Sequence, residues 1–129
     1  MTDDRKRGEI RGFKDLEVWQ VAMRLVRECY VLTRSFPDTE RFGLTNQLRR
    51  AAVSVPSNIA EGQGRGSSKG VLQFLWIANG SLAEVETQVL LSIDLEFIGQ
   101  NEALSVIDLI QQVGRMLTGL RRSIERQLP

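Results

Sequence analysis

Histidine is absent from this chain, and cysteine occurs once, at Cys29. Without histidine, the sequence excludes Ser/His/Asp triads, Cys/His dyads and the commonest zinc and di-iron ligand sets, so carboxylate chemistry is the main enzymatic option left. A single thiol forms no internal disulfide, which agrees with a reducing compartment. We therefore expect no enzyme activity, no metal and no cofactor.

Neither strong net charge nor long hydrophobic runs are present. Lysine plus arginine total 17 against 16 acids, a formal net charge of +1, so bulk charge indicates neither a nucleic-acid binder nor an acidic-ligand sink. The apolar runs are shorter than a bilayer span, and residues 1–12 lack the apolar core of a signal peptide. We expect a cytoplasmic protein without membrane contact, with a flexible arm at 1–12 and one domain at 13–129.

Apolar residues at helical spacing predict four helices and no strand. The first helix is expected over about 15–36. The second begins between Thr39 and Thr45 and ends at Gly62, the third runs over about 69–98, and the fourth over about 101–127. Short connectors between them predict an all-α, antiparallel up-and-down four-helix bundle.

Capping residues suggest where these helices begin and end. Thr39 or Thr45 is expected to cap the second helix, and Ser67 or Ser68 the third. Gly62 is expected to stop the second helix as a left-handed residue. Residues 99–101 are expected to combine a glycine stop with an asparagine cap for the fourth helix, which is predicted to bury Leu104, Ile107, Ile110, Val113, Leu117, Leu120 and Ile124.

The third predicted helix is apolar nearly all round. Residues 70–100 contain four acids and no lysine or arginine. A helix of this kind is normally buried on several sides, yet each helix of a four-helix domain has an outer face. The excess apolar surface predicts burial against another copy of the chain, and therefore a homo-oligomer.

Pro56 lies inside the second predicted helix. Proline lacks an N–H and crowds the carbonyl four residues earlier, on Ala52, which costs about 3 kcal/mol in a helix interior. Val55 is a poor N-cap, so one bent helix is favoured over two, with the helix kink at Pro56. The polar side chains of Ser54, Ser57 and Asn58 are expected to bond the freed carbonyl or a neighbouring helix.

Arginines suggest two basic patches that could contact phosphates. The first, around one end of the second helix, comprises Arg41, Arg49, Arg50, Arg65 and Lys69; the second, on the last helix, comprises Arg115, Arg121 and Arg122. The alternative, which we favour, is solvated helix faces with intersubunit salt bridges and favourable helix-dipole contacts. No aromatic residues are interleaved with these arginines, so the sequence gives little support for base stacking.

A set of polar residues lies among apolar ones on the second and third helices: Ser54, Asn58, Glu61, Asn79, Ser81, Glu84 and Gln88. One interpretation is a ligand or metal site between the two helices. The other, which we favour, is a buried hydrogen-bond network that fixes helix register.

Three segments carry a family resemblance: FKDLEVWQVA (Phe13–Ala22), FPDTERFGLTNQLRRAAVSVPSNIAEG (Phe36–Gly62) and IANGSLAEVETQ (Ile77–Gln88). They resemble the bacterial four-helix bundle protein family, some members of which are encoded in intervening sequences of large-subunit ribosomal RNA genes. The resemblance implies an up-and-down bundle that assembles as a homopentamer with a central channel. It also implies kinship with the accessory protein of diversity-generating retroelements, a pentameric barrel that binds nucleic acid and a reverse transcriptase through a basic surface.

Together these observations lead to two functional hypotheses. The first is a non-enzymatic homo-oligomeric scaffold, pentameric by resemblance, that binds RNA or DNA weakly and with little sequence preference. The alternative is a protein-binding adaptor that has no nucleic-acid role. Salt distinguishes them, because phosphate contacts release counterions and weaken steeply as salt rises.

Overall fold

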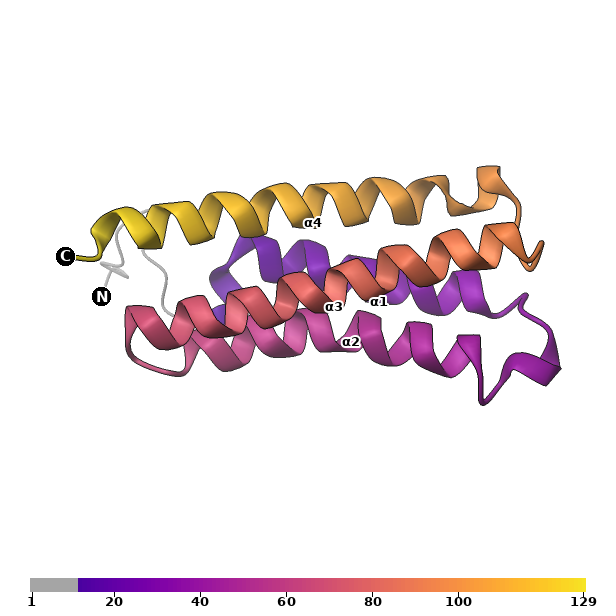
Figure 1. Cartoon of the computed structure of the whole chain (residues 1–129), viewed down its shortest axis with the longest axis horizontal. Coiled ribbons are helices and arrows are strands. Elements are labelled where there is room, and N and C mark those ends of the chain that lie inside the picture. The colour runs from indigo at the N-terminus through magenta and orange to yellow at the C-terminus, as the bar shows by residue number, and fades with distance from the viewer. Residues whose placement is uncertain (1–11) are drawn as a thin grey trace, which may run out of the picture.

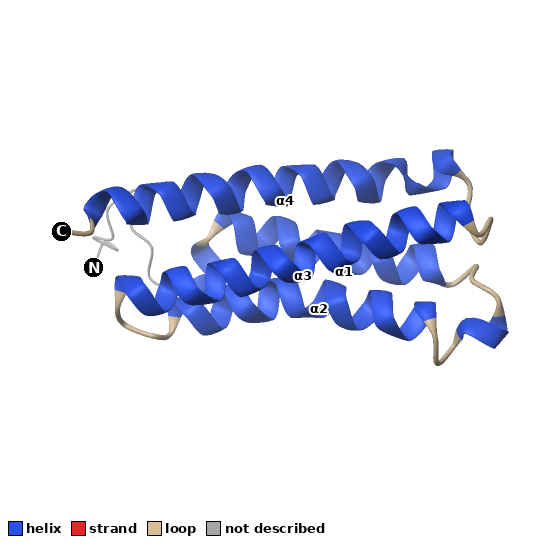
Figure 2. Ribbon diagram, in the orientation of Figure 1, coloured by secondary structure: helices blue, strands red, loops and turns tan. Residues whose placement is uncertain are grey.

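The computed structural model describes residues 12–129, so the expected arm falls, except for Gly12, outside the described residues. The described chain contains helices and loops and no strand (Figure 2). Two short 3-10 helices, η1 (Phe13–Asp15) and η2 (Asp38–Glu40), precede the first and second long helices. The long helices are α1 (Glu17–Thr33), α2 (Leu44–Gln63), α3 (Ser68–Asp94) and α4 (Gln100–Gln127).

The four long helices run alternately up and down in one bundle (Figure 1). Each helix packs against its neighbours in sequence, and α4 returns to pack against α1, whereas the backbones of the diagonal pairs lie farther apart. This arrangement confirms the predicted all-α four-helix fold. The α2–α3 pair forms the most extensive of these contacts.

The first two helices bury the apolar residues that recur at helical spacing in their sequences. On α2 these are Leu44, Leu48, Ala51, Ala52, Val55 and Ile59, and on and just after α1 they are Val18, Ala22, Leu25, Cys29, Leu32 and Phe36. The prediction is less accurate on α4, where Ile110, Val113 and Leu117 are buried and Ile107, Leu120 and Ile124 are partly buried. Leu104 is 59% exposed, while its neighbour Ala103 is fully buried. Neighbouring residues of a helix lie 100° apart, so the core-facing stripe of α4 is rotated by one position at its start. The largest fully buried side chains are Leu25, Leu48, Val55, Ile59, Val85, Val89, Val106, Val113 and Leu117.

Helix α2 begins differently from the prediction. Neither Thr39 nor Thr45 caps it; instead the carboxylate of Glu40 accepts a hydrogen bond from the backbone N–H of Leu44, with N···O 3.1 Å. An acid at this position also lies near the positive end of the helix dipole. The start of α3 does follow the prediction, since the Ser67 hydroxyl accepts from the Gly70 N–H at 3.1 Å.

The glycine signals for helix ends are only partly correct. Gly62 is not a left-handed stop, because α2 continues to Gln63 and Gly62 is buried inside it. The left-handed residue after α3 is Glu96, with φ 63°, and α3 ends before it at Asp94. Gly99 is extended, and its N–H donates to the Glu102 carboxylate at 2.9 Å, so Asn101 lies inside α4 rather than capping it.

Helix α1 is much shorter than α3 and α4. With 17 residues against 27 and 28, it spans about 25 Å where the longer helices span about 40 Å. Its C-terminal end is level with the other helices, so the end of the bundle that holds the α2–α3 connector lacks α1 (Figure 1). In residues 12–129, none of these helices has the length and apolar character needed to cross a membrane.

Candidate functional site

Pro56 lies inside α2, which continues through it as a single helix, while the expected kink stays a prediction. Of the polar side chains around it, Ser54 bonds the neighbouring helix as predicted, whereas Ser57 and Asn58 bond carbonyls of α2 other than the one on Ala52 that Pro56 leaves without its usual donor. Ser57 donates to the Val53 carbonyl at 2.8 Å, and Asn58 donates to the Ser54 carbonyl at 2.8 Å and to the Ser54 hydroxyl at 2.9 Å. Ser54 in turn bonds Ser81 on α3, with Oγ···Oγ 2.8 Å. The cluster therefore links α2 to α3.

Only part of the predicted polar network is joined by hydrogen bonds. Glu61 is exposed and forms an ion pair with Arg65 at 3.1 Å. Asn79 faces α4, whereas Glu84 and Gln88 line a groove between α2 and α3. The Oε1 atom of Gln88 is buried and has no hydrogen-bond donor among the described residues. In residues 12–129, no three histidine, cysteine or carboxylate side chains gather as metal ligands would.

The first predicted basic patch is divided between the two ends of α2. Arg49 and Arg50 lie in its early turns, and Arg65 and Lys69 lie beyond its end. A rise of 1.5 Å per residue separates the two groups by about 20 Å. The prediction of one continuous patch is therefore wrong. Arg65 and Lys69 instead lie at the same end of the bundle as Arg121 and Arg122, near the end of α4 (Figure 1).

Four of these arginines lie over aromatic rings, which the sequence argument missed. The guanidinium carbon lies 4.0 to 5.4 Å from the ring centroid in each pair. Such contacts hold the guanidinium against the ring face while leaving its edges able to donate; the edges of Arg65 and Arg121 meet Glu61 and Glu125, at 3.1 and 4.0 Å. The adjacent residues Arg41 and Phe42 already signalled one pair. The pairs are Arg41 with Phe42, Arg49 with Tyr30, Arg65 with Phe74, and Arg121 with Trp76.

Two of the pairs occur where α1 ends and α2 begins. Together with Arg50 they form what we call the arginine–aromatic cluster: Tyr30, Arg41, Phe42, Arg49 and Arg50. Within residues 12–129, no carboxylate lies within ion-pair distance of its arginines. The two neighbouring arginines differ in how firmly their side chains are held. Arg49 donates from Nε to the buried Thr33 hydroxyl at 2.8 Å, whereas Arg50 is exposed.

The arginine–aromatic cluster adjoins a groove between α2 and α3, which we call the α2–α3 groove. Its volume is about 530 Å³, within the range of roughly 300 to 1,000 Å³ that is typical of small-ligand sites. The walls are mostly polar. Asn46, Gln47, Arg50 and Ser54 come from α2, Glu84 and Gln88 come from α3, and Phe42 stands at the beginning of α2.

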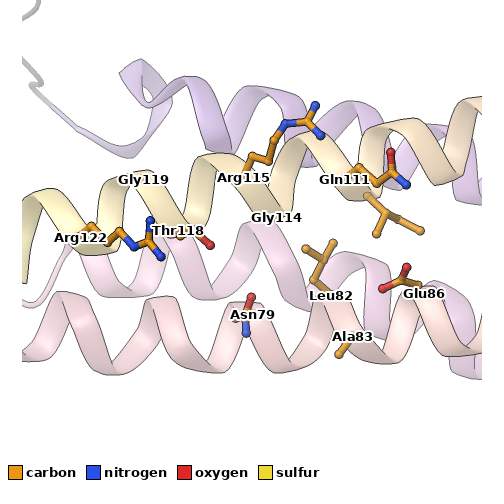
Figure 3. Close-up of a pocket in the computed structure, with 11 residues that line it drawn as sticks. Asn79, Leu82, Ala83, Glu86, Gln111, Gly114, Arg115, Thr118, Gly119 and Arg122 are labelled. Atoms are coloured by element: carbon orange, nitrogen blue, oxygen red, sulfur yellow. The ribbon is translucent and has the colours of Figure 1, made fainter.

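A second groove, the α3–α4 groove, has a volume of about 670 Å³. Figure 3 shows Asn79, Ala83 and Glu86 along α3, and Arg115 and Arg122 along α4. Arg115 and Arg122 are exposed and have no ion-pair partner in the described residues. The groove is thus lined by two predicted cations that are seven residues apart on α4, together with one acid, Glu86, which lies near Gln111 (Figure 3).

The outer surface of α3 is apolar as well as acidic. Trp76 is 51% exposed, and Leu90, Leu91 and Leu95 are 51%, 44% and 56% exposed. No lysine or arginine occurs between residues 70 and 114. Exposed apolar side chains that are contiguous are typical of interaction surfaces, so the outer surface of α3 is a candidate for one.

Cys29 lies in the core, fully buried on α1. Burial, and secondly the charge of Glu28, raise the pKa of its thiol to about 12. The thiol is therefore uncharged near neutral pH and is a packing residue.

Residues 14–119, which make up most of the helical domain, match the family described as 23S rRNA-intervening sequence protein. The chain belongs to this family. The match spans α1 to α3, where the resemblance was noted, and extends through much of α4. None of the curated proteins matches the chain.

A solved structure shares the fold. It is the crystal structure of a protein of unknown function from the S23 ribosomal protein family of Bacteroides thetaiotaomicron. The TM-score is 0.72 at 20% sequence identity, and the match covers 81% of this chain and 97% of that one. At this identity the likeness concerns the fold alone.

Proposed function

We propose that this family member is a non-enzymatic, homo-oligomeric scaffold that binds RNA or DNA weakly through the arginine–aromatic cluster. The proposal rests mainly on the observation that two arginines of this cluster form no ion pair with a carboxylate of the described residues. Arg41 and Arg50 are exposed, have no carboxylate partner in the described residues, and lie beside the 85% exposed ring of Phe42. Unpaired cations next to an open aromatic face suit a phosphate backbone with accessible bases.

Self-association is supported by the outer surface of α3. Its exposed leucines are accompanied by Asp94 and Glu96, with no cation on the same helix beyond Lys69. The outer positions of α1 instead carry arginines, at residues 24, 27 and 34. An acidic, apolar face and a basic face on one molecule are complementary between copies, and such a heterologous contact generates a ring when its rotation closes. The pentamer and the cytoplasmic location rest on the resemblance and composition.

The binding proposal is tested by fluorescence anisotropy with labelled single-stranded RNA, structured RNA and duplex DNA, at about 50 to 200 mM salt. We expect the affinity to fall steeply with salt. Replacing Arg50 by glutamine should weaken binding and reduce the salt slope by about 0.7 per lost single-strand phosphate contact. Arg50 is preferred to Arg49 because Arg49 also bonds Thr33.

The matched control is Arg126→Gln, which removes the same charge from the exposed last turn of α4, outside both predicted patches and at the opposite end of the bundle from the beginning of α2 (Figure 1). Light scattering behind a sizing column should give a multiple of the 14.6 kDa chain mass for all variants. An intact oligomer that binds no nucleic acid at low salt would overturn the binding proposal. Equal effects of Arg50→Gln and Arg126→Gln would remove the cluster as the contact surface, and a monomer would remove the scaffold.

The adaptor is the second candidate, and the exposed leucines of α3 favour it. If they contact a different protein, the chain will bind that protein and no nucleic acid, whatever its own oligomeric state. Because an apolar interface releases few counterions, partner binding would then persist as salt rises.

A further inference from the structure

We propose that the α2–α3 groove receives a single unpaired base of a bound strand, and that it prefers bases with an exocyclic amino group. This inference rests on the proposed nucleic-acid function and assigns one site to it. Three features of the groove support it: an aromatic platform at its mouth, a wall of hydrogen-bond acceptors and a cation on the opposite wall.

Phe42 is the aromatic platform. It is the most exposed large apolar side chain of the described residues, at 85%, and it lines the groove at the beginning of α2. The Arg41 guanidinium lies 5.4 Å from its ring centroid. An aromatic ring held in this way offers a face on which a base of any sequence can stack.

The α3 wall supplies acceptors. Glu84 and Gln88 are one helical turn apart and both line the groove. Glu84 has no hydrogen bond or ion pair among the described residues, and the buried Oε1 of Gln88 has no donor there. A buried acceptor without a donor is costly, and the terminal torsion of glutamine turns easily, so a ligand donor can engage it.

These acceptors discriminate among bases. Carboxylate and amide oxygens accept from the amino groups of cytosine and adenine, whereas uracil presents carbonyl oxygens at the corresponding position. A uracil carbonyl against Glu84 would bring two acceptors together. The groove therefore favours an amino-bearing base over uracil.

The α2 wall fixes the orientation of the nucleotide. Arg50 provides a cation, and Asn46 and Gln47 provide amides that donate or accept. Because Glu84 repels phosphate, the sugar-phosphate backbone is expected to pass on the Arg50 side, with the base directed toward α3. The two walls thus have distinct roles.

The probes are labelled oligouridine strands of about nine nucleotides, a length within single-strand site sizes. At the central position they carry uridine, cytidine, adenosine or an abasic residue. Anisotropy gives each affinity for the full-length wild-type oligomer. We expect the cytidine and adenosine strands to bind about tenfold more tightly than the uridine strand, and the abasic strand to bind most weakly.

Two variants test the walls separately. Phe42→Leu should weaken the cytidine strand about tenfold through lost stacking, with little effect on the abasic strand. Glu84→Gln should reduce the preference for cytidine over uridine while leaving the abasic strand equally or more tightly bound. Glu86→Gln is the matched control, because it removes the same charge two residues away, in the α3–α4 groove.

The outcomes separate this inference from the proposed function. If all strands bind with a steep salt dependence but without base preference, or if Glu84→Gln and Glu86→Gln act alike, the groove is not a base site although the nucleic-acid scaffold stands. If no strand binds, both proposals fail. Capture of a peptide in the groove that Phe42→Leu abolishes, with no strand bound, would assign the groove to a protein partner.

Discussion

Replacing Gly62 by alanine tests how closely α2 and α3 approach. Gly62 is buried in the last turn of α2. A Cβ atom there would lie 2.8 Å from the Cβ of Phe74 and 3.3 Å from the carbonyl oxygen of Val71. Neither atom can rotate away, because the first is attached to the backbone and the second belongs to it. The added methyl group must therefore push the two helices apart.

Two opposing effects decide the magnitude. Alanine is favoured over glycine by up to about 1 kcal/mol inside a helix, and by less near its end. Overpacking in a close-packed region costs about 1 to 3 kcal/mol. Since Gly62 is the penultimate residue of α2, the steric cost wins, and Gly62→Ala should lower the free energy of unfolding by about 1 to 2 kcal/mol. This corresponds to a fall in Tm of roughly 4 °C per kcal/mol.

The assay is urea unfolding at a fixed protomer concentration, because oligomerisation makes stability depend on concentration. The control is Gly119→Ala in α4, where an added Cβ meets nothing within 4 Å. That variant should be stabilised by about 1 kcal/mol. If Gly62→Ala is stabilised as much as Gly119→Ala, the steric reasoning is refuted and the α2–α3 approach is looser than the structure has it.

Two further predictions concern the core. Asn58→Ala removes two hydrogen bonds to Ser54 and should lower the free energy of unfolding by about 1 to 3 kcal/mol, without changing nucleic-acid binding of the folded oligomer. The control is Ser57→Ala at an exposed position, which should lower it by less than about 0.5 kcal/mol. Equal losses of stability in urea unfolding would contradict the hydrogen-bond network. Burial raises the pKa of the Cys29 thiol from 9.0 to about 12, so the thiol ionises at lower pH in the unfolded state than in the folded state. The free energy of unfolding should therefore fall between these pH values by up to about 1.4 kcal/mol per pH unit, and Cys29→Ala should abolish this fall in unfolding titrations. Rapid reaction of the native thiol with a thiol reagent at about pH 8 would contradict its burial.

The sequence predicted the fold well where one physical signal dominates. Apolar periodicity located all four helices because burial of an apolar stripe is the main driving force for a bundle. It was less accurate on α4, where Leu104 and Ala103 are both apolar and the pattern fits either rotation. The bend at Pro56 stays a prediction, although the helix does continue through it.

Side-chain chemistry at helix ends was harder to predict. The cap of α2 is Glu40, four residues before the N–H that it accepts from, in a turn that also contains the more usual cap Thr39. Gly62 was recognised as important for the wrong reason, since its lack of a side chain permits close packing rather than a left-handed turn. The Glu40 cap and the close packing at Gly62 both depend on how separate segments of the chain meet, and local helix propensity carries no information about that.

The candidate site was only partly predictable for the same reason. The residue types were identified, but a linear order does not show that Arg49 reaches Tyr30 on another helix, or that Arg65 and Arg50 lie at opposite ends of α2. The buried, donorless oxygen of Gln88 has no sequence signature at all. The adjacent Arg41 and Phe42 were the available signal for the aromatic platform.

The proposed oligomer and the proposed base site support one another. A single groove with one cation and one stacking ring gives weak binding, because few phosphates and one base are engaged. A homo-oligomer repeats that groove once per protomer, and a strand that reaches the next groove binds it at high effective concentration. Repetition can therefore supply the affinity that a nearly neutral chain lacks in bulk charge. On this reasoning the apolar face of α3 and the groove beside it are parts of one design, in which assembly determines how tightly nucleic acid is held.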